Sequence, residues 1–242
     1  MSTSEPQSER LSRPYAPIGS PQYRTKKTDK LTLIATEMAC VHNCIIRGLN
    51  ALFKHALTVQ AADYAAFITL ANIWQKFVKK HHDSEERTFF LPLQKTINPE
   101  AMKVSLDEHA TFHDGLEELQ TYLASLAGSE SSYDGKEFTR ILNSFSDALV
   151  THLTHEIPAL MTLDQFGDVD EIAKMWYTGV DAEVKTMKMG DFVTIVPFVL
   201  LAHDKKFEDG LHNNFPPMPA PILFMVRNVF SWPNRAAWKF LD

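Results

Sequence analysis

The fold is decided by one stretch of the chain, FTRILNSFSDALVTHLTHEIPALMTL, at residues 138–163. Its large apolar residues recur in steps of three and four, the spacing that places side chains on one face of an α-helix. The row consists of Phe138, Leu142, Phe145, Leu149, His152, Glu156, Ala159 and Leu163. A helix with this pattern turns its apolar face to a protein core. A histidine and a carboxylate are therefore expected to be buried with it.

Three stretches upstream repeat this pattern, with short breaks near residues 58–61, 96–100 and 128–135. Their rows are Leu31, Ile34, Met38, His42, Ile45, Leu49 and Leu52; then Phe67, Leu70, Trp74, Val78, His81, Glu85, Phe89 and Pro92; then Leu106, His109, His113, Leu116 and Leu123. Four long helices with short connections predict an all-α fold, an up-down-up-down four-helix bundle over residues 29–165.

The flanking segments differ in composition from the bundle. Residues 1–28 are rich in Ser, Pro, Gln and charged residues, and we expect a flexible N-terminal arm without the apolar stretch of a signal peptide. Residues 166–242 are apolar and Pro-rich. This composition predicts a helical C-terminal extension that packs on the bundle.

Composition and charge exclude several classes of function. The chain has 242 residues, 45% of them hydrophobic, and a net charge of -6, which leaves no basic surface for nucleic acid. The longest apolar runs, 192–202 and 222–230, are about half of the roughly 20 residues that cross a bilayer, so no membrane span is expected. The only cysteines, Cys40 and Cys44, do not make a disulfide framework. A reducing, cytoplasmic location is the resulting prediction.

The buried polar residues predict a metal site. A carboxylate in an apolar core costs several kcal/mol unless it is neutralised, paired or bound to a cation. Glu85 follows His81 by four residues and Glu156 follows His152 by four, which places each pair on one helix face. The complete candidate set is His42, His81, Glu85, His109, His113, His152 and Glu156. Five imidazoles and two carboxylates, with no thiolate, suit a dinuclear non-haem iron site, with zinc or manganese as alternatives.

A single histidine on an apolar helix face is usually a core residue, but here such residues recur once in every helix. The pair His82 and Glu86 has the same spacing as His81 and Glu85, and its row runs back through Lys79 and Gln75, which indicates a rim face. Two further alternatives concern other histidines. His155 could replace His152 or support it, and His55 is expected at the surface.

These motifs resemble the hemerythrin-like (HHE) cation-binding family. A lone His42 is followed by HHDSEE at 81–86, HATFH at 109–113 and HLTHE at 152–156, and the layout with its C-terminal extension is similar to fungal members. The resemblance implies a di-iron centre that binds dioxygen or nitric oxide. It also implies that His109, His113 and His152 hold one iron, that His42 and His81 hold the other, and that Glu85 and Glu156 bridge them.

Three functions follow as hypotheses. The first is reversible binding of dioxygen or nitric oxide. The second is a di-iron oxidase or oxygenase acting on a small organic substrate, as in secondary metabolism, and the third is iron storage or sensing. A large pocket beside His42 and His81, walled by the extension, would favour an enzyme, and a plugged one would favour a carrier. The sequence names neither the substrate nor the oligomeric state.

Overall fold

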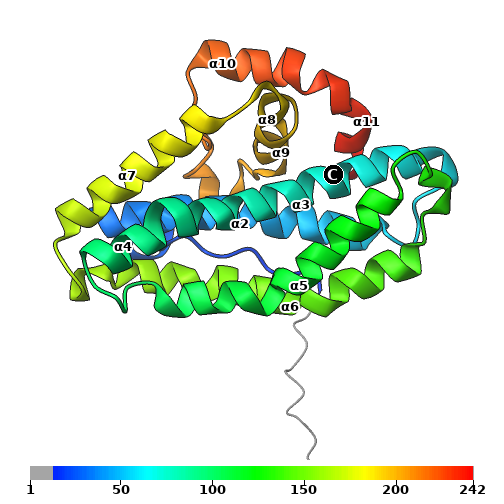
Figure 1. Ribbon diagram of the computed structural model, residues 1–242. Coiled ribbons are helices and arrows are strands. Elements are labelled where there is room, and N and C mark those ends of the chain that lie inside the picture. Colours follow the sequence, from blue (N-terminus) through cyan, green and yellow to red (C-terminus); the bar gives the residue numbers. More distant parts are fainter. Residues whose placement is uncertain (1–12, 242) are drawn as a thin grey trace, which may run out of the picture.

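The computed structural model describes residues 13–241, and this part of the chain contains helices and no strand. Its central part is a bundle of four long antiparallel helices: α2 (Lys30–His55), α3 (Tyr64–Glu85), α5 (Lys103–Ser125) and α6 (Gly135–Met161) (Figure 1). The predicted all-α four-helix bundle with a helical C-terminal extension is confirmed.

Side-chain caps explain where two of these helices begin. The Asp29 carboxylate accepts a hydrogen bond from the backbone N–H of Thr32, which fixes the start of α2. The Asp134 carboxylate does the same for Lys136 and Glu137 at the start of α6. Caps of this kind satisfy backbone donors that the first helical turn leaves free. The bundle helices are therefore set by local chemistry as well as by their apolar rows.

One end of the bundle has an aromatic core. Phe67 packs edge-to-face on Phe138 and on Phe240, with ring centroids 5.5 Å and 5.3 Å apart. Farther along, the buried Trp74 indole donates to the Ile45 carbonyl at 2.9 Å. Gly48 permits this approach, since a Cβ there would lie 2.4 Å from the Trp74 ring. These contacts hold α2, α3 and α6 together.

A π-helical turn, Glu86–Phe90, interrupts the helix at the end of α3, and α4 (Leu91–Thr96) continues it. A π-turn contains one residue more than an α-helical turn, and the extra residue changes the direction of the side chains that follow it. Phe89 and Phe90 are both buried here. The turn begins at the residue after Glu85, which places the irregularity beside the candidate metal ligands.

The N-terminal segment packs on the bundle from residue 13 onward. It contains the short helix α1 (Pro21–Thr25), and the buried Tyr15 hydroxyl donates to Asp147 at 2.6 Å. The backbone N–H of Ile18 donates to Asn43 at 2.7 Å. Residues 13–28 thus differ from the flexible arm expected over 1–28, because Tyr15 and Ile18 are buried in the core of the bundle. The remainder of that arm lies outside the described residues.

The C-terminal extension covers the side of the bundle away from α5 and α6 (Figure 1). Its helices are α7 (Val169–Thr186), α8 (Met189–Val193), α9 (Ile195–Ala202), α10 (Ala220–Met225) and α11 (Arg235–Trp238). A second π-turn spans Val226–Phe230, and short 3-10 turns span Ala61–Asp63, Glu130–Ser132, Leu163–Gln165, Phe207–Gly210, Trp232–Asn234 and Lys239–Leu241. Phe198 of α9 packs on Phe77 of α3, with centroids 5.5 Å apart. Within residues 13–241, none of the helices is long and apolar enough to cross a bilayer.

Candidate metal centre

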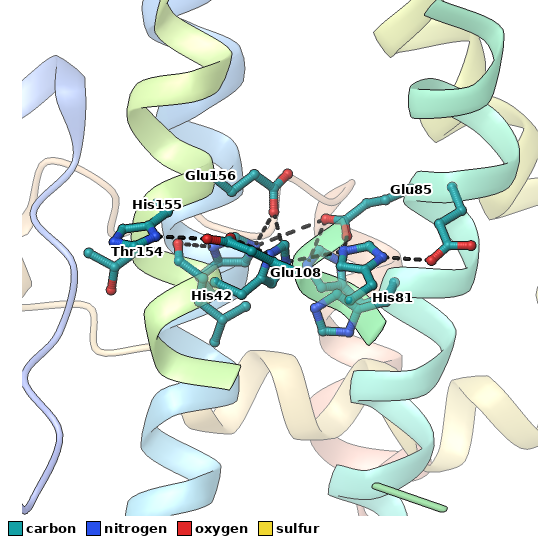
Figure 2. Close-up of polar contacts among 12 residues, drawn as sticks. His42, His81, Glu85, Glu108, Thr154, His155 and Glu156 are labelled. Atoms are coloured by element: carbon teal, nitrogen blue, oxygen red, sulfur yellow. Dashed lines mark hydrogen bonds and ion pairs between the residues drawn. The ribbon is translucent and has the colours of Figure 1, made fainter. Parts of the chain in front are cut away.

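Polar side chains from all four bundle helices meet in the interior. Glu85 and Glu156 point toward a common centre from α3 and α6, with His42 of α2 between them (Figure 2). Their side chains are at most 5% exposed. His81 and His82 from α3, His109 from α5 and His152 from α6 complete the cluster.

Hydrogen bonds to backbone carbonyls orient two of the imidazoles. The Nδ1–H of His42 donates to the Leu153 carbonyl at 2.8 Å. The Nδ1–H of His82 donates to the Val78 carbonyl at 2.9 Å. Because each proton is then on Nδ1, the Nε2 lone pair of each ring is free to face the centre. This is the arrangement that a metal-binding histidine requires.

Carboxylates outside the cluster orient two more imidazoles. The Nδ1 of His109 lies 2.7 Å from Glu86, and the Nδ1 of His152 lies 3.3 Å from Glu108. Glu108 also accepts from the exposed His155 at 2.9 Å (Figure 2). A carboxylate behind a histidine fixes its tautomer and makes the ring a stronger ligand. Glu108 was not among the residues predicted from the sequence, although it directly precedes His109.

The ligand atoms form two groups that share one carboxylate. The first group is His82, Glu85, His109 and His152, and the second is His42, His81 and Glu85; within each, the potential ligand atoms lie within 4.8 Å of one another. Glu156 lies between the groups, since its Oε2 is 3.5 Å from the Nε2 of His42 and 3.4 Å from that of His152. Two adjacent cation positions with carboxylates between them fit this geometry.

Unpartnered buried atoms test whether a metal fits. Both carboxylate oxygens of Glu85 and of Glu156 lack an aligned hydrogen-bond donor, and the Nε2 atoms of His42, His81 and His82 make no hydrogen bond. The Nε2 of His81 lies 2.9 Å from Oε1 of Glu85 but is not aligned for a hydrogen bond with it. Buried polar atoms are almost always paired in native proteins. In addition, the Nε2 atoms of His109 and His152 lie 3.1 Å apart and both belong to the first group of candidate ligand atoms. A cation satisfies all of these atoms at once, so the residues fit a metal.

Burial dominates the electrostatics of the cluster. It raises the pKa of Glu85 to about 8. It also raises the pKa of Glu156, and the negative charge of the nearby Glu85 raises that pKa further. Burial lowers the pKa of His81 to about 4 and lowers those of His42 and His82. For His152 burial is outweighed by Glu156, Glu85 and Glu108, and the pKa is raised. The carboxyls therefore resist ionisation and most of the imidazoles stay neutral.

The structure corrects the expectation for His113. Its side chain is 58% exposed and lies near Asp114 and Glu117, so it is not brought to the cluster. The buried row of α5 runs from His109 through Phe112, Leu116, Leu119 and Leu123. Phe112, three residues after His109, faces the interior. His113, four residues after His109, lies at the edge. His113 lies about 40° from His109 around the helix, on the side away from Phe112, and this offset places it at the edge of the buried row.

The structure also changes the interpretation of the second helix. His82 is buried and belongs to the first group, whereas it was expected on the rim. Lys79 and Gln75 indicated a rim face, but Gln75 is itself buried and donates to Gln120 at 3.2 Å. Glu86 is 39% exposed and does lie at the edge. His155 supports Glu108 and does not replace His152.

A cavity of about 220 Å³ adjoins the cluster. His81 and Glu85 form part of its wall, together with residues from α2, α3 and α7 and with Ile195 of α9. Most of the wall is apolar: Met38, Val41, Phe77, Phe89, Trp176, Val180, Val184, Met187 and Ile195. Val180 and Val184 are exposed at its mouth. The C-terminal extension thus forms one side of a cavity that leads to the candidate ligands.

Comparisons with known proteins agree with this geometry. The family model of the Hemerythrin HHE cation binding domain matches residues 34–161. The chain is 32% identical over 231 residues to the "Dimeric xanthone biosynthesis cluster protein R11" of Cryptosporiopsis sp. (strain 8999), covering 94% of this chain and 86% of that protein. No solved structure matches the chain. The match spans the bundle that carries the polar cluster, and the chain accordingly belongs to the Hemerythrin HHE cation-binding domain family.

Proposed function

We propose that the cluster holds two iron ions. His82, His109 and His152 would hold one ion and His42 and His81 the other, with Glu85 and Glu156 between them. The unpartnered buried atoms support this assignment, and the donor set of imidazoles and carboxylates without thiolate favours iron. Zinc or manganese bound to the same atoms would be an alternative outcome of metal analysis.

We further propose that the protein is a dioxygen-dependent oxidoreductase that acts on a small aromatic molecule. The observation that carries this proposal is the apolar cavity beside His81 and Glu85, which the C-terminal extension walls. A mostly apolar cavity with a few polar groups on its wall is typical of a site for a small organic molecule. The relative's name refers to biosynthesis of dimeric xanthones, which contain fused aromatic rings, and this agrees with an aromatic substrate.

The chain's own residues would prepare the site for this chemistry. Glu86 and Glu108 hold the Nδ1 positions of His109 and His152, which directs both Nε2 atoms inward. Phe112 packs beside His152, with ring centroids 5.4 Å apart, and helps to exclude water. A substrate in the cavity would approach from the side of His81 and Glu85. Iron, when bound, supplies the redox chemistry by which dioxygen oxidises an organic molecule.

Metal content tests the first part of the proposal. The purified protein is expected to contain about two iron ions per chain. Replacement of Glu85 and Glu156 together by Gln should lower this content strongly, whereas His55→Ala, outside the cluster, should not. A protein that contains no metal and takes up none under anaerobic conditions would contradict the assignment.

Exposure to dioxygen tests the second part. The iron-loaded protein is mixed with dioxygen, with and without 2-naphthol as an aromatic probe, and then flushed with argon. We expect dioxygen to be consumed, faster with the probe, and the starting absorption spectrum not to return under argon. A carrier or sensor would instead release the gas and recover its spectrum.

A matched pair of variants separates the two functions further. Val180→Trp should obstruct the mouth of the cavity and slow probe-dependent consumption while the iron content stays unchanged. Val104→Trp is the control, because Val104 is an exposed valine on α5 and is not part of the cavity wall. Equal rates in both variants would argue against the cavity as the substrate site.

The two cysteines bear on the compartment. Cys40 and Cys44 are both buried and unbridged. Free thiols of this kind support a reducing compartment, and we propose the cytosol.

A further inference from the structure

Glu37 is a charged residue of the cavity wall that belongs neither to the ion pair of Lys80 and Glu183 nor to the candidate metal centre. Lys80 and Glu183 pair with each other at 3.2 Å, and His81 and Glu85 belong to the candidate metal centre. Glu37 of α2 is the remaining charged residue of the wall, half-buried among apolar side chains. A carboxyl in such a place costs free energy unless something binds it.

A buried hydrogen-bond donor lies on the wall of the same cavity. The Trp176 side chain of α7 is 8% exposed, and its indole Nε1–H has no aligned acceptor. Glu37 is close enough for the indole to hold down the pKa of its carboxyl, against the larger effect of burial, which raises it. Glu37 thus offers an acceptor on the cavity wall, and Trp176 offers a donor that has no aligned partner.

We propose that Glu37 and Trp176 form a subsite that binds the hydroxyl group of a phenolic substrate. A hydroxyl can donate to Glu37 and accept from the Trp176 N–H at the same time. An ammonium group cannot accept from the indole, a carbonyl cannot donate to Glu37, and a carboxylate would be repelled by it. This inference rests on the proposed function, because it specifies the substrate class of the same cavity.

The surrounding rings favour an aromatic carrier for that hydroxyl. Phe77 and Phe89 line the cavity with Trp176, and Phe89 packs edge-to-face on the indole with centroids 5.1 Å apart. Glu37 comes from α2 and Trp176 from α7, while His81 and Glu85 come from α3. A phenol held by the subsite would therefore lie in the same cavity as the candidate iron ligands.

Calorimetric titration of the full-length, metal-loaded protein without dioxygen tests the subsite. The probes are 2-naphthol, its methyl ether 2-methoxynaphthalene, and 2-naphthoate. We expect 2-naphthol to bind at least about tenfold more tightly than the ether, as loss of one hydrogen bond to a charged group implies. The carboxylate of 2-naphthoate should bind more weakly still.

Variants then assign the preference to the two residues. Glu37→Leu and Trp176→Phe should each reduce the preference for 2-naphthol over the ether to near one. The matched controls are Glu171→Gln, an exposed carboxylate on α7, and Trp232→Phe, an exposed tryptophan, and both should keep the wild-type preference.

Either of two results overturns the subsite: equal binding of alcohol and ether by the wild type, or an unchanged preference in the Glu37 and Trp176 variants. Since these titrations involve no dioxygen and no turnover, they do not depend on the oxidation experiment. A protein that prefers 2-naphthol but never consumes dioxygen would retain the subsite and lose the proposed function.

Discussion

The two ends of the bundle interior bury different kinds of group. At the end where α3 and α6 begin, Phe67, Phe138 and Phe240 pack ring against ring, and the buried Tyr133 hydroxyl donates to the Ala56 carbonyl at 2.9 Å. Toward the other end, Glu85 and Glu156 lie among imidazoles with unpartnered oxygens. The Tyr133 hydroxyl at the aromatic end is paired without a ligand. The polar centre leaves buried atoms unpartnered unless a cation binds there, so the two ends should respond differently to mutation, chelation and pH.

The largest effect is expected at the aromatic end. Phe67→Ala should lower the free energy of unfolding by about 3–5 kcal/mol, because the ring is fully buried and its loss leaves a cavity. Denaturant unfolding measures this, and the loss should be the same with and without a chelator. The exposed Phe224→Ala is the control and should change stability by less than about 0.5 kcal/mol. A loss at Phe67 that depended on metal would mean that the two ends are coupled.

Removal of the metal should produce the next largest effect. A ligand that binds only the folded state stabilises it by RT ln(1 + [L]/Kd), about 2.7 kcal/mol at a hundredfold excess over Kd. The chelated protein should therefore melt at a lower temperature than the metal-loaded protein. Thermal unfolding of both forms near neutral pH measures the difference. If the two forms melt together, the buried carboxylates are not metal ligands.

The metal-free protein should lose stability on the alkaline side. Glu85 has its pKa raised from 4.5 to about 8 in the folded state, so folding keeps it protonated where the unfolded chain ionises. The contribution of protonated Glu85 to the free energy of unfolding is complete below about pH 4.5 and is lost as the pH rises through about 8. Glu85→Gln should flatten this loss, because an amide does not ionise. Urea unfolding of chelated protein across this range measures it, and parallel curves for both proteins would contradict the burial of an ionisable Glu85.

The same protein should lose stability on the acidic side for the opposite reason. Burial lowers the pKa of His81 from 6.5 to about 4. Between these pH values the unfolded chain binds a proton at His81 and the folded chain does not. This stability is complete above about pH 6.5 and is lost as the pH falls through about 4. The same titrations should therefore show greatest stability at an intermediate pH, and His81→Ala should weaken the acidic decline.

The smallest effect is expected at His113. His113→Ala should change neither the metal content nor, beyond about 0.5 kcal/mol, the stability, because the side chain is exposed. His82→Ala, its counterpart in the polar centre, should lower the metal content. Elemental analysis of the two variants gives the comparison directly. Loss of metal in His113→Ala with normal content in His82→Ala would reverse the assignment made from the structure.

Much of the site could be predicted because helical periodicity is a local property. The apolar rows located the bundle helices and brought His42, His81, His109 and His152 to the interior together with both glutamates. Buried carboxylates then pointed to a cation on energetic grounds. The supporting carboxylates Glu86 and Glu108 carry no such signal, since exposed acidic residues are common on any helix.

The sequence by itself determined which helix faces are apolar, and from this followed the bundle, the buried carboxylates and the prediction of a metal site. The tertiary structure decided which of two neighbouring side chains faces inward. His109 and His113 differ by about 40° around a helix, so a small rotation of the packed helix brings His109 in and leaves His113 out. His81 and His82 differ by about 100°, and the packing of α3 brings both to the cluster. The cavity with Glu37 and Trp176 was likewise decided by tertiary structure. Its walls come from α2, α3, α7 and α9, and only their packing brings these segments together.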